Sequence, residues 1–336
     1  MIDTSIPLVE LHRHLDGNIR LETILDLGRQ HSIALPAWEV EGLRPFVQVT
    51  DPQPGVMAFI SKFQWPMRVL VDGEACRRVA YENVEDAKQD GLDYIELRFS
   101  PWFMADANGL DPALVVDAVV DGCEAGGRDL GVKVSLIGIL SRTYGPDIAA
   151  KELGALLSQR EHIIGLDLAG DEAHFPAEWF REHFRRAREA GWHITAHAGE
   201  IAGPESIWQA LRELGAERIG HALRAVEDPV LISYMAEHHI GVESCLTSNV
   251  QTGCVPDYPS HPLKTFLKKS IPATINTDDP GISGIDLPYE YNVAALRAGL
   301  SEAQIRQAQV NALEVSFLTE AERQSLLIRK GTNLEM

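Results

Sequence analysis

Eight short runs of apolar and β-branched residues alternate along this chain with longer segments of helical character. The expected strands cover residues 8–12, 94–99, 133–140, 163–168, 193–196, 218–220, 241–244 and 273–276. The expected helices cover residues 74–90, 112–130, 147–158, 177–190, 204–214, 228–238 and 261–269. Such alternation predicts parallel strands joined by helical crossovers. Eight strands in 336 residues fit a closed (β/α)8 TIM barrel better than an open sheet, so we expect one α/β domain over residues 1–336.

Two segments exceed what a barrel needs. Residues 31–73 separate the first strand from its expected helix, and 301–330 form a charged, amphipathic C-terminal helical region expected to pack on the barrel. Within the first segment, four apolar residues follow the spacing i, i+3, i+4 and i+7, namely Val56, Phe59, Ile60 and Phe63. This spacing predicts one apolar helical face. The segment is expected either to pack on the barrel or to form a helical lid over a pocket.

Composition excludes several classes of partner. The formal net charge of −19 opposes binding to nucleic acid or to an anionic membrane surface. No apolar stretch reaches the roughly 20 residues that a membrane span needs, and residues 1–4 do not begin a signal peptide. The cysteines, Cys76, Cys123, Cys245 and Cys254, are scattered, which favours a reducing cytoplasm. No pattern sets an oligomeric state.

Residues able to bind a metal stand at several predicted strand ends. They are His12, His14, His197 and Asp278. The carboxyl ends of barrel strands meet at one face, so these side chains are expected to converge there. Residues two apart in a strand face the same side, so His12 and His14 both point inward. Three imidazoles and one carboxylate form a ligand set suited to a catalytic zinc ion.

Other strand ends carry groups that can move protons. Glu200 follows His197 by three residues, and a carboxyl with a raised pKa beside a metal can act as a general acid or base. His221 is placed to orient or deprotonate a water on the metal. Asp279 follows a proposed ligand and is expected to turn to another side of the site. The fourth strand lacks the lysine that bridges two metals in binuclear hydrolases, which favours one ion per chain.

These residues lie in segments that resemble the adenosine deaminase family of metal-dependent amidohydrolase barrels, and its bacterial members in particular. The matching segments are residues 12–17 (HRHLDG), 167–172 (DLAGDE), 197–200 (HAGE), 220–221 (GH), 248–249 (SN) and 276–280 (NTDDP). They extend over almost the whole chain. One departure is Ala222, which follows His221 where the family usually has glycine. Its methyl group is expected to tighten this loop and to be tolerated.

The resemblance implies a role for each matching residue. One Zn²⁺ would be held by His12, His14, His197 and Asp278. The catalytic residues would be Glu200, which protonates purine N1, His221, which orients the attacking hydroxide, and Asp279, which contacts N7 and the attacking oxygen.

The resemblance also implies a substrate-binding set, namely His14, Asp16, Gly170 and Asp279. Asp16 would accept a hydrogen bond from the ribose 5′ hydroxyl, and the Gly170 amide would reach N3. The apolar face of 56–63 would correspond to the family's gate.

The implied reaction is hydrolytic deamination of adenosine, and of 2′-deoxyadenosine, to the inosine product and ammonia in cytoplasmic purine salvage. The alternative is a deaminase of adenine or another aminopurine on the same barrel. Asp16 favours a ribose over free adenine and disfavours AMP, whose phosphate it would repel. A zinc protein without catalysis is disfavoured because Glu200 and His221 are both present. The cytidine-deaminase signature, H-x-E with P-C-x-x-C, is missing.

Overall fold

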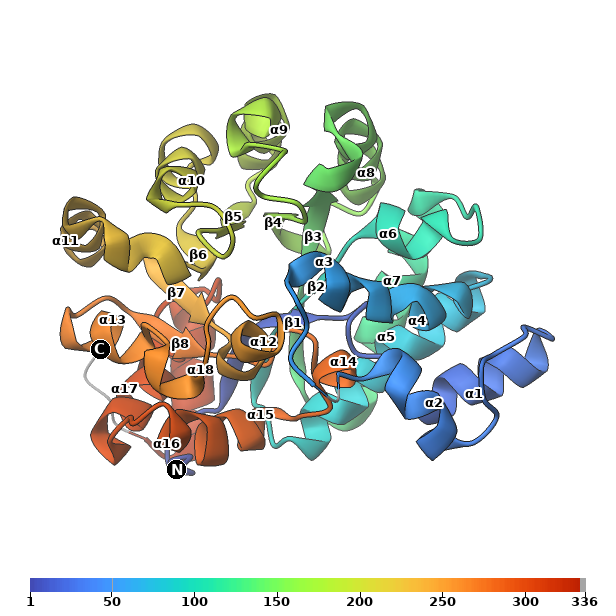
Figure 1. Cartoon of the computed structure of the whole chain (residues 1–336), viewed down its shortest axis with the longest axis horizontal. Helices are drawn as coiled ribbons and strands as arrows, with labels where there is room; N and C mark the ends of the chain where they lie inside the picture. Colours follow the sequence, from blue (N-terminus) through green and yellow to red (C-terminus); the bar gives the residue numbers. More distant parts are fainter. Residues whose placement is uncertain (50, 333–336) are drawn as a thin grey trace.

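Eight parallel strands follow one another around the sheet in chain order, which confirms the predicted (β/α)8 barrel. The computed structural model describes residues 1–49 and 51–332. Its strands are β1 (Val9–His14), β2 (Tyr94–Phe99), β3 (Lys133–Ser141), β4 (Ile163–Ala169), β5 (His193–Ala198), β6 (Arg218–His221), β7 (Gly241–Ser244) and β8 (Ala273–Ile275). Figure 1 shows them at the centre of a ring of helices. Strand β1 extends to His14, two residues beyond the predicted end.

The helices on the N-terminal half are α1 (Leu21–Gln30), α2 (Val40–Val47), α3 (Val56–Ile60), η1 (Ser61–Phe63), α4 (Gln64–Arg68), α5 (Gly73–Gln89), α6 (Pro101–Asp106), α7 (Pro112–Leu130), η2 (Arg142–Tyr144) and α8 (Pro146–Ser158). Local sequence sets their ends. Asp72 caps α5 by accepting a hydrogen bond from the Ala75 amide. Pro112 begins α7, and Gly131, with φ 72°, ends it in the left-handed conformation that glycine adopts freely.

The remaining helices are η3 (Ala177–Phe180), α9 (Arg181–Glu189), α10 (Pro204–Gln209), η4 (Ala210–Leu214), η5 (Leu223–Glu227), α11 (Pro229–Glu237), α12 (Leu246–Gln251), η6 (Tyr258–Ser260), α13 (Leu263–Lys268), α14 (Pro280–Ser283), α15 (Leu287–Tyr289), η7 (Glu290–Ala294), α16 (Ala295–Arg297), α17 (Glu302–Glu314) and α18 (Glu320–Lys330). The helix expected over 204–214 is α10 followed by the π-helical turn η4. In the described part of the chain, no helix is long and apolar enough to cross a membrane.

Hydrogen bonds close the barrel between its first strand and the residues that follow its last strand. The Leu11 amide donates to the side-chain oxygen of Asn276 at 3.0 Å. The Asp278 amide donates to the His12 carbonyl at 2.9 Å, and the His14 amide donates to the Asp278 carbonyl at 2.7 Å. The backbone of three predicted metal ligands therefore joins the first strand to the segment after the last strand. These bonds between β1 and the residues after β8, called the seam below, also fix the backbone positions from which the three side chains project.

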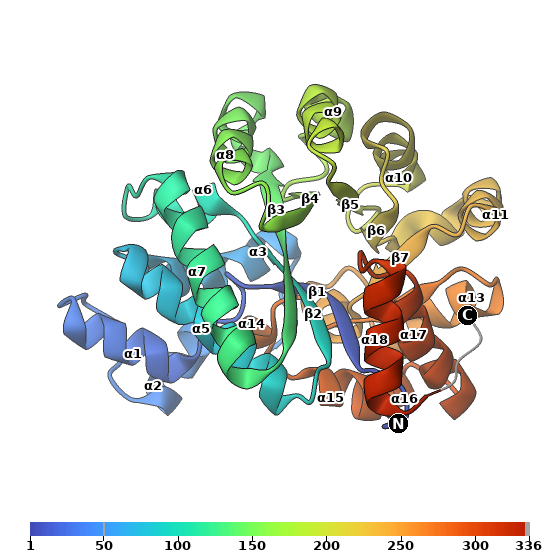
Figure 2. The same cartoon turned by 180° about the vertical axis from the view of Figure 1, so that it is seen from behind.

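The two segments beyond the barrel lie on different sides of it. Helix α3 is drawn in front of the strands in Figure 1, whereas α17 and α18 are in front in Figure 2, the view from behind. Helix α17 packs against β1 and β8. It is tied to the barrel by Asn311, whose side chain donates to the Ala273 carbonyl at 2.8 Å, and by Gln309, which donates to the Ile6 carbonyl at 3.1 Å.

Candidate active site

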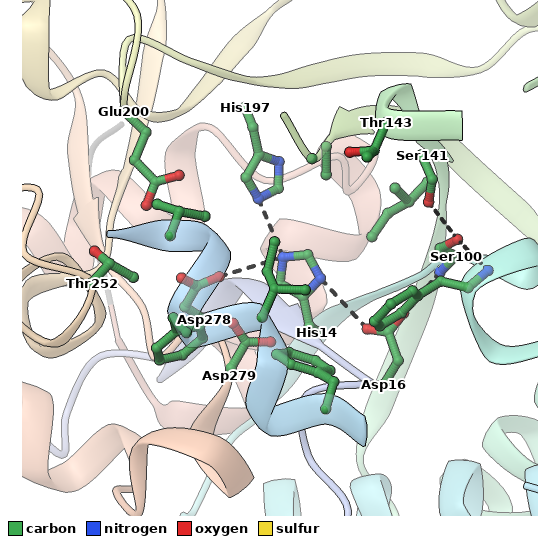
Figure 3. A pocket seen from close by; sticks show the side chains of 18 of the residues that line it. His14, Asp16, Ser100, Ser141, Thr143, His197, Glu200, Thr252, Asp278 and Asp279 are labelled. Carbon is green, nitrogen blue, oxygen red and sulfur yellow. Dashed lines mark hydrogen bonds and ion pairs between the residues drawn. The ribbon is translucent and has the colours of Figure 1, made fainter. Parts of the chain in front are cut away.

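The four predicted metal ligands meet at the carboxyl ends of β1, β5 and β8. One ligand atom from each of His12, His14, His197 and Asp278 lies within 4.8 Å of the others. The Nε2 atoms of His14 and His197 are 3.2 Å apart, and Asp278 Oδ1 lies 3.0 Å from His12 Nε2 and 3.4 Å from His14 Nε2. Figure 3 shows His14, His197 and Asp278 pointing toward one another. The cluster therefore presents three nitrogens and one oxygen to one point.

Two buried carboxylates fix the orientation of the histidines. His12 Nδ1 donates to Glu243 Oε2 at 2.7 Å, and His197 Nδ1 donates to Asp167 Oδ1 at 3.1 Å. A carboxylate accepts only, so each Nδ1 carries the ring hydrogen. The lone pair of each Nε2 then faces the centre of the cluster, as a metal ligand requires.

One guanidinium holds both of those carboxylates. Arg98 donates through Nη1 to Asp167 at 2.8 Å and through Nη2 to Glu243 at 2.7 Å, and all three side chains are fully buried. Arg218 Nε adds a further bond to Glu243 at 2.7 Å. Burial alone would raise the pKa of both carboxyls. The hydrogen-bonded His197 and the charge of Arg98 instead hold the pKa of Asp167 well below its usual range, and Arg98 with Arg218 does so for Glu243.

Sequence reasoning did not find this supporting layer. Asp167 belongs to a segment matched to the family, but no role was assigned to it. Arg98 and Glu243 lie within predicted strands and have no role in the sequence analysis. One sequence pattern could have indicated these residues, namely a charged residue inside a strand that is buried on both faces. A charge in that position requires a partner of opposite charge.

The donor atoms fit a bound cation. His12 Nε2 is buried and, among the described residues, makes no hydrogen bond, although it lies 3.0 Å from Asp278 Oδ1. The second oxygen of Asp278 accepts from Ser248 Oγ at 2.6 Å, which leaves Oδ1 free for a ligand. Burial would lower the pKa of His14, but the carboxylates of Asp279, Asp16 and Asp278 outweigh it and raise that pKa to about 9. The excess of negative charge at this point favours a cation.

A second combination of possible ligands lies nearby, formed by His221, Cys245 and Asp278. It uses the same aspartate as the first. Burial raises the pKa of Cys245 well above its usual value, and a metal needs the thiolate. The first cluster is therefore the better metal site.

Glu200 and His221 stand beside the cluster. His221 Nε2 is 3.9 Å from Glu200 Oε2, and His221 is 1% exposed. Burial raises the pKa of Glu200, while His221 opposes the shift. Burial and the neighbouring Asp278 raise the pKa of Asp279 well above its usual value. Glu200 and Asp279 are therefore set to keep a proton at a pH where ordinary carboxyls lose it.

Left-handed backbone positions direct these side chains. Asp278 has φ 69°, which turns the chain between the two adjacent aspartates. His221 and Ala222 have φ 64° and 51°, so two residues with side chains adopt in succession a conformation that favours glycine. The left-handed backbone conformation at position 222 accounts for the glycine that the family usually has there. Here Ala222 is fully buried, and its amide donates to the Ala198 carbonyl at 3.2 Å.

A pocket opens above the cluster, with Asp16 on one wall. Asp16 Oδ2 accepts from the Ser100 amide at 3.1 Å. Its Oδ1 is buried and makes no hydrogen bond among the described residues, although His14 Nδ1 lies 3.5 Å away. A buried acceptor that faces a pocket in this way requires a donor from a ligand. Asp279 Oδ1 is also buried and makes no hydrogen bond among the described residues.

Gly170 and the apolar segment complete the pocket. Gly170 has φ 112°, and a Cβ there would lie 2.5 Å from Thr143 Oγ1, so only glycine fits. The four apolar residues Val56, Phe59, Ile60 and Phe63 line the same pocket. They belong to α3 and η1. The described residues that line the pocket include no lysine or arginine, the side chains that usually bind a phosphate group.

Known proteins share this sequence and fold. A family model described as adenosine deaminase matches residues 7–330. An adenosine deaminase from Edwardsiella ictaluri is 60% identical over 326 residues, which cover 97% of this chain and 98% of the relative. The structure of an adenine deaminase from Arthrobacter aurescens matches with a TM-score of 0.89 and 27% identity, covering 97% of this chain and 98% of the other.

A zinc-containing relative has also been solved. The structure of an amidohydrolase from Burkholderia ambifaria, with bound Zn, matches with a TM-score of 0.88 and 25% identity, covering 98% of this chain and 90% of the other. The curated relative is more than twice as identical to this chain as either solved structure. Because the family match spans almost every residue at this level of identity, the chain belongs to the adenosine deaminase family.

Proposed function

We propose that this protein is a zinc-dependent enzyme that hydrolyses adenosine, and 2′-deoxyadenosine, to the corresponding inosine and ammonia. One observation carries the proposal: a three-nitrogen, one-oxygen cluster shares its pocket with Glu200 and with the unpartnered carboxylate oxygen of Asp16. The first part supplies a metal centre, the second a proton donor, and the third a recognition point for a hydroxyl group. Zinc is the metal proposed, because its usual ligands match this set and a related amidohydrolase contains it.

The metal would be held by His12, His14, His197 and Asp278. When bound, zinc supplies a Lewis acid that lowers the pKa of water from about 16 to about 7, which provides a nucleophile at neutral pH. The ligands need no rearrangement for this task, since Arg98 and its two carboxylates hold His12 and His197 in place.

The chain's own acids would manage the protons. Glu200 would donate its proton to purine N1, which offsets the loss of aromaticity as C6 is attacked. Its raised pKa supports this role, because the acid must be protonated before it can donate. His221 would orient the attacking oxygen. Asp279 would accept or donate hydrogen bonds at N7 and at that oxygen through its unpartnered Oδ1.

Recognition of the nucleoside would involve the opposite wall. Asp16 Oδ1 would accept a hydrogen bond from the ribose 5′ hydroxyl, and the Gly170 amide would reach N3. His14 would contact the substrate at the edge of the metal cluster. We propose that residues 31–73 act as a lid, because α3 and η1 supply apolar pocket residues while Met57, on the same segment, remains 54% exposed.

Adenine deamination is the second candidate, since an adenine deaminase shares the fold. The buried, unpartnered oxygen of Asp16 favours adenosine, because free adenine has no hydroxyl to satisfy it. The acidic total charge and the pocket without lysine or arginine favour a neutral nucleoside over AMP or nucleic acid. A cytoplasmic location would be consistent with the four free cysteines.

The test is the change in ultraviolet absorbance when zinc-loaded protein meets adenosine, with 2′-deoxyadenosine, adenine and AMP in parallel reactions. We expect turnover of both nucleosides and little of the other two. An Asp16→Asn variant should lose kcat/KM for adenosine. Preference for adenine or AMP would overturn the substrate assignment. If activity survives complete removal of metal and does not increase when zinc is added, the proposed metal chemistry is overturned.

A further inference from the structure

The matched segment Ser248-Asn249 contains a residue that the proposed mechanism has not used. Asn249 is fully buried on α12, and its side chain lies between the two groups that would handle protons. Its Nδ2 is 3.1 Å from His221 Nδ1 and 3.4 Å from Glu200 Oε1. Its Oδ1 is 3.1 Å from Nε2 of His261, a histidine that is 3% exposed. One amide therefore contacts Glu200, His221 and a third buried group.

The direction of these hydrogen bonds follows from a backbone amide. The Leu263 N–H, which can only donate, points to His261 Nδ1 at 3.1 Å. His261 Nδ1 is therefore an acceptor, and the ring hydrogen lies on Nε2. That hydrogen is donated to Asn249 Oδ1, so the NH₂ group of the amide must face the other way. It donates to His221 Nδ1 and toward Glu200 Oε1.

The hydrogen bonds from Leu263 through His261 and Asn249 to His221 cannot simply reverse their direction. Burial lowers the pKa of His261 to about 3, so its ring stays neutral with one hydrogen. A flipped Asn249 amide would place its NH₂ group against the His261 Nε2–H, donor against donor. The Asn249 backbone is also held, since its carbonyl accepts from the Val255 amide at 3.0 Å.

Building on the proposed function, we propose that Asn249, locked by His261, is a positioning residue that determines which atoms of His221 and Glu200 carry a proton. His221 Nδ1 accepts, so the hydrogen of the neutral ring lies on Nε2, the atom nearer to Glu200. Glu200 Oε1 accepts from Asn249 and has the Cys254 thiol at 3.9 Å, so the transferable proton lies on Oε2. His221 then orients the attacking oxygen as a hydrogen-bond donor and does not serve as its base.

A matched pair of variants at His261 tests this chain of donors. In His261→Gln, the side-chain NH₂ falls near the former Nε2 and can still donate to Asn249. In His261→Asn, the side-chain oxygen falls near the former Nδ1, so the Leu263 amide keeps its partner but Asn249 loses its donor. Both variants remove the imidazole. His261→Gln keeps only the bond to Asn249 and His261→Asn keeps only the bond to the Leu263 amide, so higher activity in His261→Gln assigns the effect to the bond to Asn249. Asn249→Ala and Asn249→Asp extend the test, since a carboxylate at 249 can only accept and would draw the hydrogen of His221 to Nδ1.

Two readouts are needed, both on zinc-loaded protein. The first is the tautomer of His221, read from ¹H–¹⁵N spectra of protein with labelled histidine and assigned with a His221→Asn variant. The second is the division of any loss between kcat and KM for adenosine. Zinc content and the thermal midpoint are recorded for every variant.

We expect the wild type to hold the Nε2–H tautomer. His261→Asn and Asn249→Ala should lose kcat by about 10- to 100-fold, the range for lost orienting partners, with little change in KM. His261→Gln should recover most of that loss, and Asn249→Asp should move the hydrogen to Nδ1.

An Nδ1–H tautomer in the wild type would overturn the inference. So would a His261→Gln variant as impaired as His261→Asn, or wild-type kcat in Asn249→Ala. A wild type inactive on adenosine but with the Nε2–H tautomer would contradict the proposed reaction alone and leave the hydrogen-bond chain standing.

Discussion

Two sets of buried carboxyls in this barrel behave in opposite ways. Asp167 and Glu243, beneath the cluster of predicted metal ligands, are fully buried, while Asp279 and Glu200, at its mouth, are 7% and 11% exposed. Burial acts to raise the pKa of all four. The lower pair nevertheless has a lowered pKa, whereas that of the upper pair is raised. The difference lies in Arg98, which contacts both lower carboxylates.

The comparison separates two uses of the same side chain. A buried carboxylate that is paired with a guanidinium remains charged and can hold a histidine in one orientation. A buried carboxyl without such a partner keeps its proton and can deliver it. Placement of one cation therefore determines which acids support the site and which are available for its chemistry.

Replacing an upper acid should have the largest effect. Glu200→Gln removes the transferable proton and keeps the shape, so kcat should fall by about 10²- to 10⁴-fold while zinc remains bound. Steady-state kinetics and metal analysis measure both quantities. Glu290→Gln is the matched control, because Glu290 is fully buried, has a raised pKa and does not line the pocket. An unchanged rate in Glu200→Gln would remove this residue from the mechanism.

Removing the Arg98 guanidinium should raise the pKa of Asp167 and Glu243, as the pKa of Glu200 and Asp279 is already raised. Arg98→Met leaves two buried carboxylates without their shared partner, and breaking a buried pair costs about 3–5 kcal/mol in the free energy of unfolding. Zinc affinity should also fall, because His12 and His197 lose their support. Urea unfolding and competition with a chelator measure these effects. Arg20→Met, which breaks half-exposed pairs with Glu85 and Asp86, should cost at most about 1 kcal/mol. Equal losses in both variants would refute the special position of Arg98.

A smaller change separates support of the metal from support of the fold. Ser248→Ala removes the 2.6 Å hydrogen bond to Asp278, and a bond to a charged group contributes about 1.5–3 kcal/mol. We expect weaker zinc binding in a chelator titration. Ser316→Ala, which removes a bond to the Leu313 carbonyl far from the cluster, should leave zinc binding unchanged. If Ser248→Ala binds zinc as tightly as the wild type, the hydrogen bond from Ser248 does not help to hold Asp278 as a ligand.

The last prediction concerns pH and an acid outside the site, and its effect is small when it is taken per pH unit. Burial raises the pKa of Glu290 to about 8 from an ordinary value of 4.5. The folded protein therefore binds one more proton than the unfolded chain between those values. The resulting stability is complete below pH 4.5 and is lost at up to about 1.4 kcal/mol per pH unit as the pH rises toward 8. Glu290→Gln should flatten this slope in urea unfolding measured across that range. A slope identical to the wild type would mean that Glu290 is charged when folded.

Much of the fold was predictable because each barrel strand is a short apolar run and each crossover has helical spacing. The convergence of His12, His197 and Asp278 was also predictable, since parallel strands bring their carboxyl ends to one face. The break of the 204–214 helix at its π-helical turn was not, because that turn depends on packing around it.

The supporting groups were harder to find. Arg98 and Glu243 lie in different strands, and only closure of the barrel brings them together. His261 lies outside the segments that resemble the family. It is buried, and its contact with Asn249 joins α12 to the turn after η6. No spacing along the chain encodes such a contact, since it depends on how the loops fold back over the barrel.

The seam between β1 and β8 has a consequence for synthesis of the protein. His12 emerges among the first residues, but Asp278, a proposed ligand whose backbone closes the barrel, is made roughly 15 to 50 seconds later at about 5–20 residues per second. A partial chain on the ribosome has neither the closed seam nor the full ligand set. The metal can therefore stabilise only a finished chain, and a truncated product has no such protection against proteolysis.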